Sequence, residues 1–452
     1  MPRLIYSFIL SLTFLFEAVP ASSATIEFWT FETQSDRVKT IQLLIDTFQA
    51  LNPDISVKLI SVDENDIPSQ MAAASAAGNL PGLIEVGSEL AMAFGEEGIL
   101  DIQGTTKLLN RIGRDRFFQG PLKMVETPEP GKYYGLPYYG WVQGIWYRAD
   151  WFKKAGLEPP DTWDNILKAA KTLHKPEENI YGILMGTKAD LYTEQCFTHL
   201  ALSNGAGEFN SRGDLVFNSK ETLDTLKYYM ELAKYTPPGP QTWRSRDYYL
   251  QGRMAMFFYS TYIMDDLALA EIAADSLTDK HFQELKGNVF DPQLVDNTGV
   301  VSSITGTQPA CYGSIVALAL VNQGSSEKEE ASQRLAAFMY EPMSYITFLH
   351  MSPGGMNPVL RDIAEMPEYI NDDKGIFRRY GHDKMTSIVE GLDSIGSFTT
   401  VEGNSFPAAG KIYAKMIIPR MIYSVTIEGM DPQKAIALAE EQMRKVVGVE
   451  QR

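Results

Sequence analysis

Apolar and polar residues alternate along the N-terminal part of the chain with two different periods. Residues 25–31 (TIEFWTF) are rich in β-branched and aromatic side chains, and residues 35–51 carry apolar side chains three and four positions apart. We expect a strand followed by an amphipathic helix. Residues 55–60 alternate apolar and polar side chains and predict a second strand, and the alanine-rich residues 67–77 predict a helix that ends at Gly78.

A third strand is expected at residues 83–86, shortly after Pro81. The repeated order of strand, helix and strand predicts a parallel sheet with helices on both faces. In open sheets of this kind, ligands bind at the loops that follow the carboxyl ends of the strands. Charged and amide side chains there can make paired hydrogen bonds to vicinal hydroxyls of a ligand. The alternative is that they are solvated loop residues without a ligand role. The residues expected at that edge are Trp29, Glu32, Thr33, Gln34, Gly87, Ser88 and Glu89.

Later helices are predicted from the residues at their N-termini. Thr162 and Ser219 can each cap the free N–H groups of a helix that follows them. The pattern S-x-x-E that begins at Ser326 is typical of a capping box. Asp431 followed by proline predicts the start of the last helix. The helical pattern therefore continues to the end of the chain.

Aromatic residues are concentrated between residues 133 and 151, where the sequence is YYGLPYYGWVQGIWYRADW. This segment holds three of the six tryptophans and five tyrosines, whereas aromatic residues make up 11% of the whole chain. Aromatic faces pack on the C–H faces of sugar rings, and their O–H and N–H groups reach hydroxyls. Any single ring could be ordinary core. Eight rings interrupted by glycine and proline favour the wall of a sugar-binding cleft.

The first 24 residues have the features of a secretory signal peptide. They contain Arg3, an apolar run over residues 4–16 and small residues up to Ala24. A membrane span needs about 20 apolar residues, so cleavage after Ala24 is favoured over an uncleaved anchor. No cysteine stands at this site to carry a lipid. We therefore expect a protein that is free in the periplasm.

The only two cysteines are Cys196 and Cys311. In an oxidising compartment they could form one disulfide. Two thiols that are buried separately, as small hydrophobic side chains, are the alternative.

The net charge of −17 comes from 40 Lys and Arg against 57 Asp and Glu. Nucleic-acid binding rests on clustered basic residues, so that partner is not expected, and the charge favours solubility. The signatures of P-loops, serine hydrolases and zinc proteases are absent from the sequence, and the five histidines stand at no metal-ligand spacing. We expect no catalytic residue, no metal and no cofactor, although a pair of carboxylates needs no motif to act.

Several short sequence blocks follow one another along the chain. They are IEFWT (26–30), AAGNLP (76–81), YGLPY (134–138), WYRAD (146–150), AGL (155–157) with PPDTW (159–163), and GRMAM (252–256). Each block alone is weak, but the ordered set spans more than 400 residues when the chain is followed to its end. On these blocks the chain resembles the family of extracellular solute-binding proteins that serve sugar-importing ABC transporters, relatives of the maltose-binding protein.

Two positions depart from the family pattern. Gly82 stands where the family usually carries Asp, which changes little because that Asp is better explained as a strand-edge feature. Trp141 stands at the position that matches a ligand carboxylate of the maltose binder. A stacking group in place of a carboxylate implies a different sugar.

The resemblance implies an α/β fold of two lobes, the type II fold of periplasmic binding proteins, with three hinge crossings and a ligand cleft between the lobes. The family pattern assigns residues 25–133 and 260–322 to the first lobe and residues 134–259 and 323–452 to the second. The crossings are expected near Tyr133, Tyr259 and Asn322. The two cysteines then fall in different lobes, which disfavours a disulfide because it would lock the hinge.

The resemblance also adds candidate ligand contacts. Tyr138, Tyr139 and Trp141 are the stacking candidates, and Trp243 lies in a loop that its context predicts to be exposed. Packing is the alternative for Tyr192, and turn scaffolding is the alternative for residues 354–358. The remaining candidates are Asp190, Tyr192, Glu194, Tyr259, Ser260, Tyr262, Gly355 and Asn357.

The function that the resemblance implies is sugar capture for import. The protein would enclose a disaccharide, an oligosaccharide or a glycosylated polyol by hinge closure and deliver it to the permease subunits of an ABC transporter. It would be a monomer and would perform no chemistry. The alternative is a secreted glycan hydrolase with an aromatic cleft and a pair of carboxylates. A role as the soluble partner of a chemoreceptor is compatible with the first hypothesis.

Overall fold

The N-terminal segment folds as the hydrophobic pattern predicts. The computed structural model describes residues 24–448. Within them, the predicted strands and helices of residues 25–86 are present with ends within about one residue of the predicted ones. Gly78 ends its helix with a φ of 67°, a left-handed conformation that glycine adopts at little cost. The predicted signal peptide lies outside the described residues, except for Ala24, which pairs with Ile55.

The strands of the described part of the chain are β1 (Ala24–Thr30), β2 (Ile55–Ser61), β3 (Leu83–Gly87), β4 (Leu136–Arg148), β5 (Met256–Ser260), β6 (Thr298–Val301), β7 (Ser303–Thr305), β8 (Pro309–Cys311), β9 (Gly313–Leu320), β10 (Asn357–Pro358), β11 (Thr400–Val401) and β12 (Asn404–Ser405).

The α-helices up to residue 273 are α1 (Ser35–Leu51), α2 (Ile67–Ala77), α3 (Ser88–Glu96), α4 (Ile102–Ile112), α5 (Gln119–Met124), α6 (Ala149–Ala155), α7 (Trp163–Leu173), α8 (Leu191–Ser203), α9 (Lys220–Ala233), α10 (Asp247–Leu250), α11 (Ile263–Ala268) and α12 (Ala270–Ala273). The later ones are α13 (Ser326–Met339), α14 (Pro342–Leu349), α15 (Arg361–Ala364), α16 (Pro367–Ile370), α17 (Ile376–Tyr380), α18 (His382–Gly391), α19 (Pro407–Ala414), α20 (Ile417–Thr426) and α21 (Pro432–Val447). Among residues 24–448 there are also short 3₁₀ helices, of which η1 (Glu64–Asp66) and η4 (Trp243–Arg246) bear on the site.

The main sheet is mixed rather than parallel. Its eight strands include the path β10-β4-β9-β3-β1-β2, with β5 and β6 paired to β4. The predicted parallel arrangement holds for β1 with β2 and with β3. It fails at β9, which returns from the second half of the chain and runs antiparallel to both β3 and β4. The β-α-β pattern therefore predicted only the edge of the sheet that it covers.

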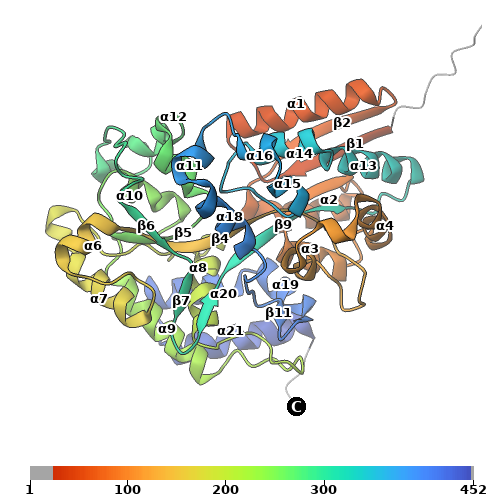
Figure 1. Ribbon diagram of the computed structural model, residues 1–452. Helices are drawn as coiled ribbons and strands as arrows, with labels where there is room; N and C mark the ends of the chain where they lie inside the picture. The colour runs from red at the N-terminus through yellow and green to blue at the C-terminus, as the bar shows by residue number, and fades with distance from the viewer. Residues whose placement is uncertain (1–23, 449–452) are drawn as a thin grey trace, which may run out of the picture.

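Strand β4 connects the two lobes of the molecule. Its first residues, up to Val142, pair with β9, and residues 143–148 pair with β5 and β6. Figure 1 shows β1, β2, α1 and α13 on one side of β4, and α6, α7, α10 and β6 on the other. The strand needs glycine where neighbours approach closely: a Cβ on Gly144 would lie 2.6 Å from the Val300 side chain.

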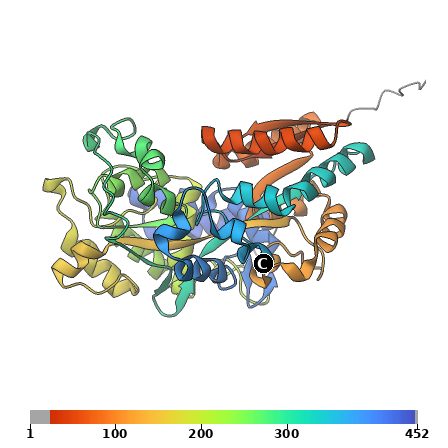
Figure 2. The same ribbon diagram turned by 45° about the horizontal axis from the view of Figure 1, so that its top comes forward.

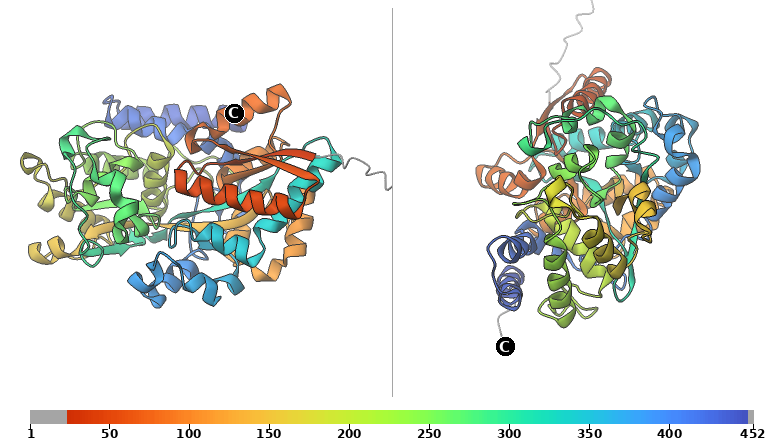
Figure 3. Two further views of the ribbon diagram at one scale, coloured as in Figure 1. Left: turned by 90° about the horizontal axis from the view of Figure 1, so that it is seen from above. Right: turned by 90° about the vertical axis from the view of Figure 1, so that its left-hand side faces the viewer.

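The packing of the later helices differs from the expected division of the chain. Helices α13 and α14, which the family pattern assigned to the second lobe, pack on β1 and α1 in the first. Figure 2 shows α1 and α13 next to each other at one end of the molecule. Helices α20 and α21 do pack on α8 and α9, in the second lobe. Seen from above, α21 runs along one edge of the molecule (Figure 3).

The tyrosines of the aromatic segment are core residues rather than a cleft wall. Tyr138 is fully buried and packs against the rings of Tyr340, Tyr345 and Phe348, with centroid distances of 5.2, 5.1 and 4.8 Å. Tyr345 and Phe348 come from α14, and Tyr340 is the C-cap residue of α13. Aromatic residues are therefore concentrated in this segment because two layers of the first lobe meet on β4. The sequence pattern could not distinguish this packing from the wall of a cleft.

Three of the four predicted helix caps are confirmed. The side chains of Thr162, Ser219 and Asp431 each accept a hydrogen bond from a backbone N–H of the following helix. The predicted capping box at Ser326 is wrong, because the helix starts at Ser326 itself and its N-cap residue makes no side-chain bond. Glu329 instead accepts a hydrogen bond from the backbone N–H of Gln323, which fixes the preceding turn.

Both cysteine side chains are free thiols, Cys196 buried and Cys311 half-buried. Of the two alternatives, the structure has separate thiols. Among residues 24–448, every helix is too short or too polar to cross a membrane.

Candidate functional site

A cavity of about 210 Å³ lies between the two lobes. It is bounded by the loop after β1, by η1, by the N-terminus of α8, by η4, and by the ends of β5 and β9. Its lining residues are Phe31, Glu32, Thr33, Gln34, Arg37, Asp63, Glu64, Asn65, Gly87, Leu90, Trp141, Asp190, Leu191, Tyr192, Gln195, Trp243, Arg246, Tyr259, Ser260, Tyr262, Ser314, Val316 and Tyr413. The loops after β1 and β2 follow the carboxyl ends of parallel strands, as the rule for open sheets predicts.

The first-lobe wall is organised around a buried arginine. Arg37 Nη1 donates to Glu32 Oε2 at 3.0 Å, and Arg37 Nη2 lies 3.8 Å from Asp265 Oδ2. Its guanidinium also lies 5.1 Å from the centre of the Tyr262 ring. Burial alone would lower the pKa of Arg37, but Glu32 and Asp265 raise it above its usual value. The guanidinium therefore stays charged and holds the Glu32 carboxylate in a fixed position beside the cavity.

A hydrogen bond at the N-terminus of α8 links the two walls. Asn65, in η1 of the first lobe, accepts a hydrogen bond through Oδ1 from the backbone N–H of Leu191 at 3.1 Å. Leu191 is the first residue of α8, in the second lobe. The amide of Asn65 thus satisfies one of the N–H groups that a helix start leaves free. The bond holds the lobes together in this structure.

Two carboxylates flank that contact. Burial, together with the negative charges of Asp63, Glu32 and other acidic neighbours, raises the pKa of Glu64 to about 7. Asp190 caps α8 by accepting from the Thr193 N–H at 3.1 Å. Burial raises the pKa of Asp190 to about 6, although the bonds from Thr193 oppose the shift. Because both pKa values lie near neutral pH, the protonation state of each carboxyl group decides its role. It accepts a hydrogen bond from a ligand hydroxyl when ionised and can donate one when protonated.

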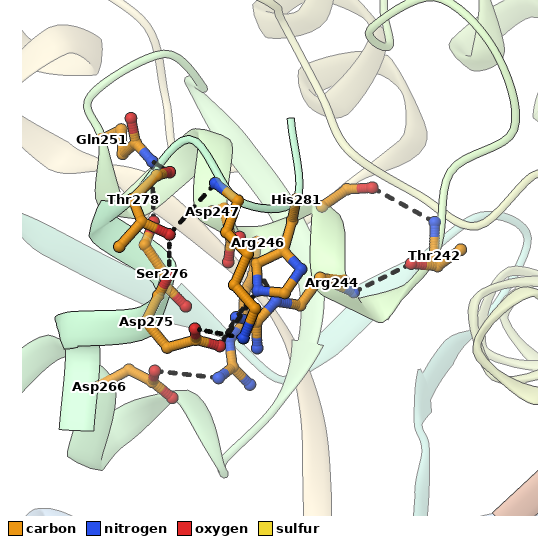
Figure 4. Close-up of polar contacts among 12 residues, drawn as sticks. Thr242, Arg244, Arg246, Asp247, Gln251, Asp266, Asp275, Ser276, Thr278 and His281 are labelled. Atoms are coloured by element: carbon orange, nitrogen blue, oxygen red, sulfur yellow. Dashed lines mark hydrogen bonds and ion pairs between the residues drawn. The ribbon is translucent and has the colours of Figure 1, made fainter. Parts of the chain in front are cut away.

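The second-lobe wall presents an aromatic and cationic cluster. Arg246 Nη1 donates to Tyr259 Oη at 2.7 Å, and Arg246 Nη2 donates to Asp266 Oδ1 at 3.0 Å. The Trp243 ring is 40% exposed and lies within 5.5 Å of the guanidinium carbons of Arg244 and Arg246. Figure 4 shows Arg246 reaching Asp266, while Arg244 points to Asp275. Trp243 is therefore exposed, as predicted, and its ring is held by cation–π contacts with two arginines.

Trp141 forms the base of the cavity. It is 8% exposed and lines the space together with Ser314 and Val316 of the adjacent strand β9. The Tyr312 ring packs edge-on against it, with centroids 5.9 Å apart and an interplanar angle of 73°. An indole held in this way keeps one orientation, which stacking on a sugar ring requires.

Many of the residues predicted from the sequence are brought together at this cavity. Those that line it are Glu32, Thr33, Gln34, Gly87, Trp141, Asp190, Tyr192, Trp243, Tyr259, Ser260 and Tyr262. Tyr192 has a packing role as well, because its hydroxyl donates to the Phe258 carbonyl at 2.6 Å. Both alternatives that the sequence left open for this residue therefore apply to its position.

Several predicted residues lie elsewhere, each held by a structural contact. The Trp29 indole donates to Glu27, and the hydroxyl of Tyr139 donates to Glu85 at 2.7 Å, below the cavity. Tyr138 belongs to the core described above. Gly355 is packed so tightly that a Cβ would lie 2.7 Å from the Tyr262 ring, and Asn357 Nδ2 donates to the Gly140 carbonyl. The turn at residues 354–358 therefore has the scaffolding role that was its alternative.

The predicted third-strand loop is a helix start. β3 ends at Gly87 and α3 begins at Ser88, whose hydroxyl donates to Glu89 Oε2 at 3.0 Å. Both side chains are buried. Glu89 lies instead on a second, smaller cavity, and Glu194 of α8 lines that same space. These two candidates are thus close to the main cavity but behind its wall.

Sequence reasoning missed part of the lining. Asp63, Glu64 and Asn65 follow β2, so the rule applied to the loops after β1 and β3 would also have found them. Arg246 lies three residues after Trp243, so the prediction of a ligand contact at Trp243 could have been extended to it. Tyr413 comes from α19 near the end of the chain, and no local sequence pattern predicts that it lines the cavity.

Comparisons with known proteins agree with this architecture. Residues 33–345 match the model of the bacterial extracellular solute-binding protein family. The chain is 27% identical over 427 residues to the putative ABC transporter periplasmic-binding protein YcjN of Escherichia coli K12, covering 94% of this chain and 93% of that protein. It is 28% identical over 206 residues to the mannitol-binding protein of Pseudomonas aeruginosa, covering 44% and 46% of the two chains.

Solved structures share the fold. A solute-binding protein of Thermotoga lettingae bound with α-D-tagatose matches with a TM-score of 0.74 at 23% identity, over 94% of this chain and all of that one. A solute-binding protein of Agrobacterium radiobacter in complex with ribitol also gives 0.74, at 18% identity, with the same coverage. Both are two-lobed ABC transporter components. With its two lobes, its cavity between them and the match over most of its length, the chain belongs to the family of bacterial extracellular solute-binding proteins.

Proposed function

We propose that this protein captures a sugar or polyol and delivers it to the permease of an ABC importer. The observation that carries the proposal is a single cavity in which ring faces and hydrogen-bonding groups from both lobes converge. Trp141 and Trp243 supply ring faces, and Glu32, Asp190 and Gln195 supply groups for hydroxyls. The similarity to a mannitol-binding protein and to solved structures bound with tagatose and ribitol supports a small polyhydroxy ligand.

We propose hinge closure as the mechanism of capture, with lobe boundaries that follow the packing. The first lobe would comprise the elements around β1–β3, β9, α13 and α14, and the second those around β5, β6, α8, α9 and α20. The hinge segments would then lie in the middle of β4, just before β9, and between α14 and α20, rather than at Tyr259 or Asn322. Tyr259 is inside β5, and the Asn322 side chain bonds to the first-lobe carbonyls of Gly98 and Leu100.

The ligand would leave the cavity unchanged. Family members serve as binding components of transporters, which favours capture over hydrolysis although carboxylates line the cavity. The proposed partners are the permease subunits, and the proposed state of the protein is a monomer.

A sugar panel screened by thermal unfolding tests the function. A ligand present at 100 times its Kd should stabilise the protein by about 2.7 kcal/mol, because it binds only the folded state. We expect one or a few sugars or polyols, including tagatose, ribitol and mannitol as probes, to raise the melting temperature. Mass spectrometry of the recovered ligand should show its original mass. A panel without any stabilising sugar or polyol would contradict the function, and shortened products would favour the hydrolase.

Export and cleavage after Ala24 are proposed for the N-terminal segment. Ala24 already pairs with Ile55 at the first position of the β1–β2 ladder, so cleavage there would trim the ladder by one residue. We expect the protein from the native cell to begin at Thr25 and to be in the periplasmic fraction. N-terminal sequencing of fractionated cells checks this, and an intact Met1 on membrane-bound protein would count against it.

A further inference from the structure

A second cavity of about 20 Å³ lies behind the main one. Its lining residues are Glu89, Glu194, Thr198, Glu208, Tyr312, Ser397, Phe398, Thr399, Ala409 and Tyr413. Tyr413 lines both cavities, so they share a wall. A space of this size holds about one water molecule or a group of similar size.

Three buried carboxylates surround this small space. Glu89 is 6% exposed, Glu194 3% and Glu208 2%. They come from α3 in the first lobe, from α8 in the second lobe, and from the segment after α8. The ion pairs found within residues 24–448 include none of these three side chains. Buried carboxylates without a cation are unusual, because burial of an unpaired charge is costly.

Two of the carboxylates have unsatisfied oxygens. Glu194 Oε2 and Glu208 Oε2 are buried and lack a hydrogen-bond partner among the described residues. Burial, followed by the charge of Glu89, raises the pKa of Glu194 to about 8, and burial and the charge of Glu194 raise the pKa of Glu208 well above its usual range. Tyr312 and Tyr413 line the same space, and burial raises the pKa of both phenols, which keeps them neutral. The lining therefore offers hydroxyl groups but no positive charge to the two unpaired carboxylate oxygens.

Glu89 connects this deficiency to the main cavity. Its carboxylate oxygen Oε2 would lie 3.5 Å from a Cβ on Gly87, and Gly87 and Ser314 line the main cavity. Glu89 is thus one residue layer away from a ligand in the main cavity. A protonated amine on that ligand is small enough for this space and carries the positive charge that the lining lacks.

We propose that the small cavity is a subsite for the protonated amine of an amino-substituted sugar or polyol. The proposal deepens the proposed function, since it rests on a polyhydroxy ligand in the main cavity. The ammonium group would donate to Glu194 Oε2 and Glu208 Oε2, with the hydroxyls of Thr198, Ser397 and Thr399 as further acceptors. Glu89 from the first lobe would complete the site only when the lobes are together.

Titration calorimetry with matched ligands tests the subsite. The pairs are D-glucose and D-glucosamine, D-glucitol and 1-amino-1-deoxy-D-glucitol, and cellobiose and its 2,2′-diamino analogue, with N-acetylglucosamine as the uncharged control. At pH 7, at least one amine should bind about tenfold or more tightly than its neutral partner, since hydrogen bonds between charged groups are the stronger ones. N-acetylation should abolish that gain.

Glu208→Gln is the informative variant, because it keeps the shape of the side chain and removes the charge. We expect it to lose most of the preference for the amine and to bind the neutral partner as the wild type does. Glu330→Gln, on the exposed face of α13, is the matched control and should keep the preference. A melting curve for each variant establishes that it is folded.

Several outcomes would overturn the subsite. Equal affinities for neutral and amino ligands would show that the carboxylates hold only protons. A preference that survives Glu208→Gln would place the amine elsewhere. Stabilisation by sodium or calcium chloride relative to choline chloride, without an amine preference, would assign the space to a free ion. In all three cases neutral sugars still bind, whereas failure of the proposed function itself would leave no sugar, neutral or amino, bound.

Discussion

Trp141→Ala is expected to weaken binding of the best sugar from the thermal panel by about 2–4 kcal/mol, the range of a buried aromatic anchor. The indole lines the cavity and is itself only 8% exposed, so a ligand would meet it in a largely desolvated site. Tyr312 already fixes its orientation, which means that little ordering is left to oppose binding. Titration calorimetry measures the change directly.

Trp151, in helix α6 directly after β4, serves as the control. Trp151 packs under the Arg148 guanidinium, 4.5 Å from the ring centre, and is not part of the cavity lining. Trp151→Ala should leave affinity unchanged. A Trp141→Ala protein that melts as a folded domain and binds with undiminished affinity would remove Trp141 from the proposed site.

Ligand binding is expected to make the molecule more compact, as measured by small-angle scattering. The cavity walls come from both lobes, so a ligand contacts all of them only in the closed arrangement and shifts the population toward it. The radius of gyration should fall when the best sugar is added. Superimposable curves with and without a ligand of micromolar affinity would rule out closure, even if sugar binding is correct.

The hydrogen bond between Asn65 and Leu191 provides a variant for the same measurement. Asn65→Ala removes the one acceptor that α8 receives from the first lobe at that point, so the closed form should lose about 1 kcal/mol. We expect about fivefold weaker binding and a smaller fraction of closed molecules at a given ligand concentration. Asn371→Ala, which removes only a bond within its own helix turn, is the control.

The sequence predicted local structure well where one face of an element is polar. The strands and helices of residues 25–86 show clear periods because each has a solvent side, and Thr162, Ser219 and Asp431 are caps whose bonds are local. The mixed sheet could not be predicted in this way. Strand β9 is buried along its whole length and comes from residues 313–320, so neither its period nor its position in the chain identifies β3 as its partner.

The candidate site was predictable to the extent that it follows from strand ends. Glu32, Thr33 and Gln34 were found by that rule. Tyr138 and Tyr139 were misassigned because a run of aromatic residues has the same appearance in a cleft and in a core. The register of β4 also shifts between Pro137 and Tyr139, so simple alternation cannot assign the side chains of this segment to one face of the sheet.

The pairing of β3 with β9 has a consequence for the order of events in folding. Leu83 lies opposite Leu320, so the centre of the main sheet stays incomplete until more than two thirds of the chain has been made. Contacts between such distant residues form slowly, because a long loop must close before they stabilise anything. The newly made chain would therefore remain extended for longer than its many local helices suggest. That delay suits a protein for which we propose export, since a chain that has not yet folded can still be threaded across a membrane.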